Sequence, residues 1–464
     1  MIDFGHVEKY RENNRIEAKR ALGGLPYSVW ETYSSFANTM GGVILLGVEE
    51  GKDKSFHAVD LPNPQALIDK FWRQVNDKRR VNVNILTKHD VRIERVNGKR
   101  IVVIEVPRAH RADKPVYIEN DMMTGTYRRG GEGDYRCTPE EIAAMRRDAA
   151  ERTQDMRLLE GVLPEALCTD TIAAYRELLR TLRPGHALER CSVNELLIQL
   201  GAAGVGSDGR LHPSAAGLLM FGSPAAIAES FPFYSVQVTG GDAPAAAPIH
   251  DNLFRFYHTV TAALHKRFHR STYAWEALTE GLVNCLVNAD HRERGGVSVE
   301  ITEDRVRFSN PGAFRINPDS ARRGGVSDAR NRAISHMFVM MGVGAGIGGG
   351  IPRMFGNWRR ANHPTPFFTE GFDPERTTLT LPLKRIRTDA HTKRRAVPEA
   401  VAKQLLAEHL THVIFARASQ ISAAVGMSLP RVRHYLTLMC REGTVVAEGT
   451  GKHAVYRLRE RAGR

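Results

Sequence analysis

The sequence predicts an α+β protein built from several domains, and three observations support this fold class. With 464 residues, the chain is too long for a single hydrophobic core, since about 150 residues per domain is usual. Hydrophobic residues make up 42% and charged residues 25%, the balance of a globular protein. Helical and strand-like patterns both occur along the chain. We place three domains at 1–155, 156–385 and 397–464, with a basic linker at 386–396.

The first domain combines one well-marked helix with several short strands. Residues 29–40 carry large apolar side chains at helical spacing, and two glycines end the pattern. Asn97-Gly98 is the turn signal of a hairpin between two strands. Thr138, followed by a proline and two glutamates, predicts the start of a helix. The expected strands are 43–48, 81–86, 91–95, 100–106 and, as the last one, 126–129.

The second domain begins with amphipathic helices and ends with strands. Residues 240–248 are rich in Pro, Ala and Gly and predict a loop. A glycine-rich stretch precedes the last strand. The expected helices are 170–181, 193–200, 252–268 and 275–288, with a short apolar element at 215–221, and the expected strands are 297–301, 305–309 and 377–383.

The third domain has the element order of a winged helix-turn-helix. Helical patterns at 398–409, 420–425 and 430–442 precede two strands at 444–448 and 454–458. A Gly-Met-Ser turn separates the last two helices, and Ser428 can cap the final one. The residues expected to face a nucleic-acid groove or contact phosphates are Arg431, Arg433, His434, Thr437 and, at the wing tip, Lys452. The alternative is a module that packs against a partner protein.

The net charge supports a polyanionic partner for this last domain. The chain carries 65 Lys and Arg against 52 Asp and Glu, a net charge of +13. Residues 381–464 contribute 16 basic and 6 acidic side chains, or +10, which leaves 49 and 46, or +3, for the first 380. Because neutralising phosphates supplies most non-specific affinity, we expect nucleic acid as the partner: DNA first, RNA as the alternative.

Several protein classes are excluded by the absence of their sequence signals. The chain has no apolar run of the 18 or more residues expected of a membrane span. Its N-terminus is charged and lacks the apolar core of a signal peptide. The five cysteines are far apart and form no C-x-x-C pair, which favours a reducing compartment. We therefore expect a cytoplasmic protein without a membrane partner. We also expect it to be a homo-oligomer.

One predicted helix carries a polar stripe that is typical of a metal and phosphate site. Glu280, Asn284 and Asn288 recur every four residues between apolar neighbours, which places them on one helix face. Polar groups in an apolar stripe need partners, and a Mg²⁺-bound phosphate would supply them. An asparagine can ligate the metal while a glutamate one turn earlier polarises water.

These residues, followed by Asn-Pro-Gly, Arg-Asn and Gly-Gly-Gly-Ile-Pro-Arg-Met, resemble the GHKL-type ATP-binding α/β sandwich of bacterial Schlafen/AlbA-domain regulators. The resemblance implies ATP and Mg²⁺ as cofactors, with Glu280 as the water-activating base and Asn284 as the metal ligand. Asn310 stands where hydrolysing relatives carry an aspartate, so binding is expected more than a weak ATPase activity. The alternative is a domain retained as a scaffold. The remaining residues implied for nucleotide binding are Asn288, Asn310, Gly312, Gly346, Gly348 and Gly350.

The N-terminal domain is similar to the Schlafen/AlbA type, most closely over residues 36–48. This family contains nucleic-acid platforms and also metal-dependent RNases with a Glu-x-x-x-x-Glu-x-Lys pattern followed by an acid. By this resemblance, Glu12, Glu17 and Glu49 or Glu50 would hold Mg²⁺ or Mn²⁺ as a catalytic centre, with Lys19 steadying the phosphate. The alternative is a set of salt-bridged surface acids on a binding domain.

Taken together, these patterns predict a nucleotide-responsive regulator that binds nucleic acid, with transcription as the expected process. The competing hypothesis is an enzyme, a Schlafen-type nuclease that the other domains regulate, for example in stress or phage defence. A scaffold that binds neither ligand is the third.

Overall fold

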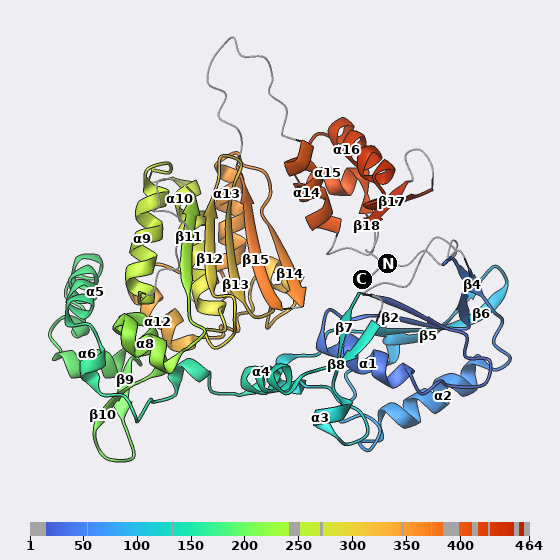
Figure 1. The fold of residues 1–464 in the computed structure, drawn as a ribbon, viewed down its shortest axis with the longest axis horizontal. Helices are drawn as coiled ribbons and strands as arrows, with labels where there is room; N and C mark the ends of the chain where they lie inside the picture. Colours follow the sequence, from blue (N-terminus) through green and yellow to red (C-terminus); the bar gives the residue numbers. More distant parts are fainter. Residues whose placement is uncertain are drawn as a thin grey trace, which may run out of the picture. The chain divides into compact units, whose positions relative to one another are not determined.

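The computed structural model describes residues 15–52, 54–131, 133–240, 251–269, 272–344, 348–372, 374–383, 399–410, 416–425, 427–449 and 454–458. The chain divides into two compact units. The first holds an N-terminal part, 15–149, and most of a C-terminal part, 399–458, and the second holds the middle part, 150–383. Figure 1 shows the elements of each part.

The N-terminal part is built on a four-stranded sheet of order β1-β2-β6-β5, in which β1 runs parallel to β2 and the other pairs are antiparallel. Helices α1 and α2 pack large aromatic side chains against one face, and the hairpin β3-β4 covers apolar residues of the other. The elements are β1 (Ile16–Lys19), α1 (Val29–Asn38), β2 (Gly42–Leu46), β3 (Val48–Glu50), β4 (Phe56–Ala58), α2 (Pro64–Val75), β5 (Val91–Val96), β6 (Lys99–Val106), α3 (Met122–Gly125), β7 (Tyr127–Gly130), β8 (Gly133–Arg136) and α4 (Pro139–Ala149).

Two polar residues of α1 hold distant segments of this part together. The Asn38 side chain donates to the carbonyls of Val116 and Tyr127 at 2.8 and 2.9 Å and accepts from the Val116 amide at 2.9 Å. Ser34 donates to the same Val116 carbonyl and accepts from the Tyr127 amide. A buried amide with its donors and acceptor satisfied fixes one arrangement of three segments.

Two strand predictions in this part need correction. Residues 81–86 are not a strand, because Val81 forms only an isolated bridge with Ile118. Side chains take the hydrogen bonds that a sheet would need: Asn82 bonds the Tyr117 amide, and Tyr33 accepts from the Ile85 amide. The strand at β7 is confirmed but is not the last, since β8 pairs with it. The hairpin at Asn97-Gly98 is confirmed, and both residues have positive φ, as a tight turn requires.

The middle part places short helices before a five-stranded sheet. The sheet has order β11-β12-β13-β15-β14, with β11 parallel to β12 and the remaining pairs antiparallel. The elements are α5 (Thr169–Leu182), α6 (Val193–Gln199), β9 (Ala203–Val205), β10 (Leu211–Pro213), α7 (Ala215–Phe221), α8 (Pro224–Ser230), β11 (Val236–Gly240), α9 (Leu253–His265), α10 (Tyr273–Asn288), β12 (Val297–Ile301), β13 (Arg305–Pro311), α11 (Pro318–Arg323), α12 (Arg332–Met340), α13 (Gly350–Arg360), β14 (Phe367–Phe372) and β15 (Glu375–Pro382).

Helices α10 and α13 lie side by side against the sheet (Figure 1). Gly281 allows α10 to approach closely, because a Cβ there would lie 3.0 Å from both Phe308 and Leu379. On α13, the indole of Trp358 donates to the Pro382 carbonyl at 3.0 Å. The glycine-rich stretch, predicted without regular structure, thus leads directly into a helix. The predicted loop at 240–248 falls almost entirely outside the described residues.

The C-terminal part has three helices and a small sheet of order β16-β18-β17. Val432, Tyr435, Leu436 and Met439 of the last helix are buried, as the apolar pattern predicts. Ser428 is its N-cap residue, but its side chain makes no capping hydrogen bond. The elements are α14 (Glu399–Leu410), β16 (Ala416–Arg417), α15 (Ala418–Val425), α16 (Leu429–Arg441), β17 (Val445–Glu448) and β18 (Val455–Leu458). None of the described helices is both long and apolar enough to cross a bilayer.

Candidate functional site

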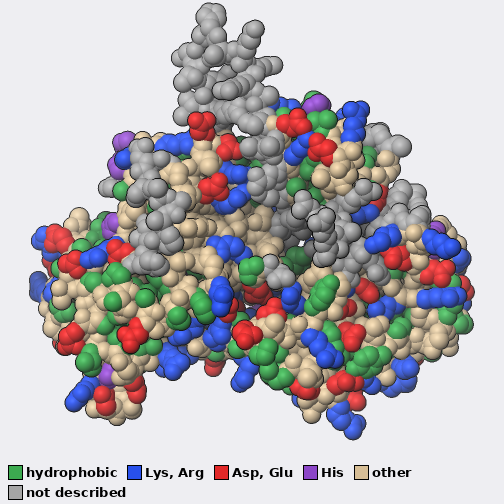
Figure 2. Space-filling view, in the orientation of Figure 1, with side chains coloured by type: hydrophobic (Ala, Val, Ile, Leu, Met, Phe, Trp, Pro, Cys, Tyr) green, Lys and Arg blue, Asp and Glu red, His purple; other side chains and the backbone are tan. Residues whose placement is uncertain are grey.

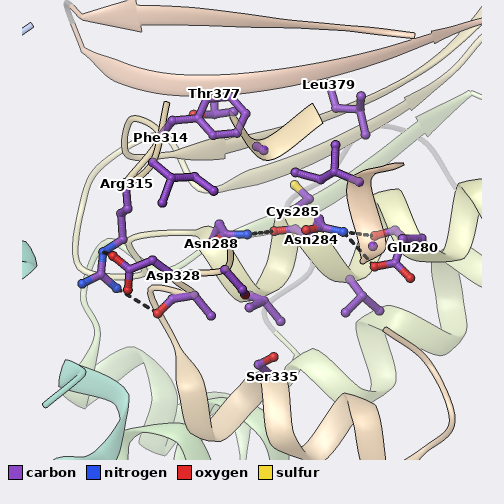
Figure 3. A pocket seen from close by; sticks show the side chains of 18 of the residues that line it. Glu280, Asn284, Cys285, Asn288, Phe314, Arg315, Asp328, Ser335, Thr377 and Leu379 are labelled. Atoms are coloured by element: carbon purple, nitrogen blue, oxygen red, sulfur yellow. Dashed lines mark hydrogen bonds and ion pairs between the residues drawn. The ribbon is translucent and has the colours of Figure 1, made fainter. Parts of the chain in front are cut away.

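A cavity in the middle part lies between α10, the sheet and the segment after β13 (Figure 3). The space inside it that is open to a water-sized group is about 130 Å³. The polar and charged residues that line it are Glu280, Asn284, Asn288, Asn310, Arg315, Ser327, Asp328, Ser335 and Thr377.

The polar stripe of α10 forms a connected row along the cavity (Figure 3). Asn284 Nδ2 donates to the Glu280 carbonyl at 2.9 Å and to Glu280 Oε1 at 3.1 Å. One turn later, Asn288 Nδ2 donates to the Asn284 carbonyl at 2.9 Å. Each amide therefore turns its nitrogen towards the preceding helical turn.

This orientation determines which atom each amide offers to a ligand. Asn310, at the end of β13, likewise uses Nδ2, which donates to the carbonyls of Pro311 and Asn288. Within the described part of the chain, every hydrogen bond of these three side chains is made by the nitrogen. The three carboxamide oxygens are thus left as acceptor atoms, and such oxygens suit Mg²⁺ or a donor group of a ligand.

At one end of the cavity, Glu280 is held from three directions. Its side chain is only 6% exposed, and its Oε2 lies 2.8 Å from Arg353 of α13. Oε1 accepts from Asn284. Gly350, the first residue of α13, is pressed so closely against the carboxylate that a Cβ would lie 2.0 Å from Oε1. A larger residue at this position would require the Glu280 carboxylate to move.

The other end of the cavity is lined by an aromatic side chain and an ion pair. Phe314 lies edge-on to Phe368 of β14, with ring centroids 4.9 Å apart. Arg315 pairs with Asp328 at 3.7 Å and donates to the Ala329 carbonyl. Thr377 of β15 donates its hydroxyl to the Gly312 carbonyl at 2.8 Å. An apolar wall with a few fixed polar groups is typical of a site that orients a flat ligand.

The C-terminal end of α10, which carries Asn288 into the site, is fixed by side chains. Asn331 Nδ2 donates to the carbonyls of Val287 and Ala289, and Arg330 Nε donates to the Asn288 carbonyl. The ring of His291 hydrogen bonds with the Leu286 carbonyl at 3.1 Å. These bonds satisfy carbonyls that a helix end leaves without intrahelical partners. Burial lowers the pKa of His291 to about 4, so the ring stays neutral near pH 7.

In the N-terminal part, Glu17 belongs to a network around a buried guanidinium. Arg129, with 1% of its side chain exposed, pairs with Glu17 at 2.9 Å and with Asp134 at 2.8 Å. Glu17 also pairs with Lys19 at 2.9 Å. Ser35 of α1 donates to Asp134. The network thus connects β1, β7, β8 and α1.

Family models match three consecutive stretches of this chain. The model described as "Schlafen, AlbA_2" matches residues 12–138. The N-terminal part is thus similar to Schlafen AlbA_2 domains, and it is called the Schlafen AlbA_2 domain below. A domain of unknown function matches residues 143–237, and the model described as "Putative ATP-dependent DNA helicase recG C-terminal" matches 295–381. Glu280 and Asn284 of α10 precede that last match, whereas Asn310, Arg353 and Thr377 lie within it.

Two solved structures are similar to the chain. The N-terminal domain of a RecG-related protein from Nitrosomonas europaea is 32% identical, covering 30% of this chain and 95% of that one, with a TM-score of 0.24. The DIP2311 protein from Corynebacterium diphtheriae is 17% identical over 96% and 95% of the two chains, with a TM-score of 0.40. No curated protein matches the chain.

The cavity brings together most of the nucleotide-site residues expected from the sequence. Glu280, Asn284, Asn288, Asn310, Gly348 and Gly350 all line it. Gly312 does not; its φ of +92° and its closeness to Arg330 shape the turn behind the cavity. Gly346 lies outside the described residues. Sequence reasoning missed Phe314, Arg315, Asp328 and Thr377. Their only signal in the sequence is that Phe314 and Arg315 follow the Asn-Pro-Gly turn within three residues.

The expected metal centre of the Schlafen AlbA_2 domain stays a prediction. Glu12 lies outside the described residues, and Glu49 and Glu50 are exposed, with Glu49 3.4 Å from Arg20. Among the described residues, no three His, Cys, Asp or Glu side chains form a group able to hold a metal. Glu17 is engaged with Arg129 and Lys19 instead.

Four of the five residues expected to contact nucleic acid lie on α16. Arg433, His434 and Thr437 are exposed and Arg431 is half-buried, while Lys452 is outside the described residues. On the face shown in Figure 2, acidic and basic side chains are interspersed. This mixture agrees with the net charge of only +3 on the first 380 residues.

Proposed function

We propose that this protein binds nucleic acid and that a nucleotide bound in the middle part regulates it. The family models support the nucleic-acid connection. The observation that carries the nucleotide half is the row of amides on α10, which runs from the buried carboxylate of Glu280 along a cavity with an aromatic side chain at its far end. A purine base stacks on aromatic rings. A divalent cation bound to phosphates is ligated by amide oxygens, and the phosphate oxygens accept hydrogen bonds from glycine backbone N–H groups.

The donor set fits a Mg²⁺-nucleotide. Asn284 would supply its carboxamide oxygen to the ion, because its nitrogen is already bonded to Glu280. Gly348 and Gly350 line the same end, where phosphate oxygens would meet the backbone at the start of α13. Asn310 and Thr377 would orient the base, since both have donors fixed to backbone carbonyls. When bound, Mg²⁺ would neutralise phosphate charge.

The C-terminal part is proposed to be the winged helix-turn-helix that contacts DNA. Support comes from its element order and from the exposed polar face of α16. The strand β16 lies between the first two of the three described helices, and an antiparallel pair of strands follows the last one.

One contact offers a route from the cavity towards the neighbouring domain. Asp155, buried shortly after α4, accepts from the Ala333 and Ile334 amides at 2.8 and 3.1 Å and so caps α12. Ser335 of that helix lines the cavity. A ligand that moves α12 would therefore act on the segment that leads to the Schlafen AlbA_2 domain.

The test is equilibrium binding of a non-hydrolysable ATP analogue to the full chain with Mg²⁺, followed by calorimetry. We expect saturable binding and a loss of affinity of about tenfold or more in Asn284→Ala, as for a lost metal ligand. Asn194→Ala, on the exposed face of α6, is the matched control and should bind like the wild type. A wild-type chain that binds no nucleotide at about 1 mM would overturn the proposal.

A further inference from the structure

The ion pair between Glu280 and Arg353 is unequal in burial. The Glu280 side chain is 6% exposed, whereas that of Arg353 is 50% exposed. Glu280 is confined by Gly350 and by its bond from Asn284. Arg353 sits in the first turn of α13 on a long side chain that reaches solvent. The arginine is thus the partner that can move.

The charged side chains that line the cavity do not by themselves favour an anionic ligand. Among the described residues lining the cavity, the charged side chains are Glu280, Asp328 and Arg315, with a sum of −1. Arg315 is already paired with Asp328 at the far end. A polyphosphate placed beside Gly348 and Gly350 would face the Glu280 carboxylate, and like charges in a poorly solvated site repel strongly.

We infer that Arg353 is the phosphate-recognition residue of this site: it holds Glu280 when the site is empty and turns to the terminal phosphate of a bound nucleoside triphosphate. The inference rests on the proposed nucleotide function and adds to it a specific residue that selects phosphorylated ligands. The planar guanidinium can bond a carboxylate and a phosphate oxygen with different N–H groups. The same movement releases Glu280 from its ion pair only when the triphosphate is present.

The experiment compares adenosine with the non-hydrolysable ATP analogue on the full-length chain, by calorimetry in Mg²⁺. In Arg353→Met we expect the affinity for the triphosphate to fall about 10- to 100-fold, as for one charge-assisted hydrogen bond, with adenosine affinity unchanged. Arg353→Lys keeps the charge but lacks the planar guanidinium. Its triphosphate affinity should lie between those of the wild type and Arg353→Met. Arg359→Met removes an exposed arginine from the end of the same helix and serves as the control.

Glu280→Gln should change the triphosphate affinity in the opposite direction to Arg353→Met. A folding defect would not raise the affinity. The substitution frees Arg353 and removes the buried negative charge, so triphosphate affinity should rise about tenfold while adenosine affinity stays constant. Equal triphosphate affinity in the wild type and Arg353→Met would overturn the inference while leaving the proposed function intact. Equal losses for adenosine and triphosphate would also overturn it, because they indicate general damage. Absence of nucleotide binding by the wild type would overturn both.

Discussion

At the residue scale, an acidic side chain can be a metal ligand or the ion-pair partner of a basic side chain. The residues around it decide which of the two roles it has. Glu17 lies beside Arg129, whose guanidinium is almost fully buried and also pairs with Asp134. A buried cation needs such partners, since its desolvation is costly. Glu17 therefore stabilises the Schlafen AlbA_2 domain by pairing with Arg129.

Replacing Glu17 with glutamine should lower the free energy of unfolding by about 3 kcal/mol, because the buried Arg129 loses a carboxylate partner. Glu49→Gln is the control, since its pair with Arg20 is largely exposed and should contribute less than about 1 kcal/mol. Calorimetry of the full chain measures both. An unchanged transition in Glu17→Gln would show that the network is dispensable. Incubation with tRNA and single-stranded DNA in Mg²⁺ or Mn²⁺ tests nuclease activity separately.

At the scale of an element, α10 shows how residues later in the chain fix the position of a helix. Its last carbonyls accept hydrogen bonds from Arg330, Asn331 and His291, so the row of amides ends at a fixed point. His291 is buried in this arrangement, against Tyr234. Because the buried imidazole is neutral, the stability of this arrangement depends on pH.

The stability of the middle part should therefore fall on acidification. The pKa of His291 is about 4 when folded and about 6.5 when unfolded, so the unfolded chain binds more protons between these values. Stability is unaffected above pH 6.5 and declines towards pH 4, by roughly 2 kcal/mol at pH 5. His291→Phe should show a smaller drop in melting temperature from about pH 7 to about pH 5. The exposed His336→Phe is the control and should behave like the wild type; identical drops in all three chains would contradict the assignment.

At the scale of the whole molecule, charge is concentrated rather than spread. Residues 381–464 carry +10 of the total +13, and the exposed face of α16 presents Arg433, His434 and Thr437. Half of this excess precedes the C-terminal domain, since residues 397–464 alone carry 10 basic and 5 acidic side chains, or +5. The linker and the C-terminal domain together thus form a basic end on a nearly balanced body. DNA affinity should accordingly depend on few side chains and strongly on salt.

Replacing Arg433 with alanine should weaken DNA binding about uniformly across sequences and reduce the slope of log affinity against log salt by about 1, if the arginine contacts a phosphate. Arg359→Ala removes the same charge from α13 and should leave the slope unchanged. Filter binding at several salt concentrations, with and without Mg-ATP, measures both effects. An unaltered slope would argue that α16 packs on a protein partner, and DNA affinity that ignores Mg-ATP would contradict the proposed regulation.

Some features could be predicted because their cause is local in sequence. The hairpin at Asn97-Gly98, the buried side of α16 and the polar face of α10 depend on turn chemistry or on spacing along one element. Others depend on distant partners. Residues 81–86 look like a strand, but Asn82 and Tyr33 take their backbone hydrogen bonds.

The sequence by itself therefore determined the order of the modules, the uneven charge and the row of Glu280, Asn284 and Asn288. Only the tertiary structure decided that this row faces a cavity with Phe314 and Thr377, that Arg353 holds Glu280 and that Arg129 engages Glu17. The physical reason is that periodicity specifies which residues share a face. Charge pairing and burial, which decide their chemistry, depend on side chains brought together from distant segments, such as Glu17 and Arg129, which are 112 residues apart.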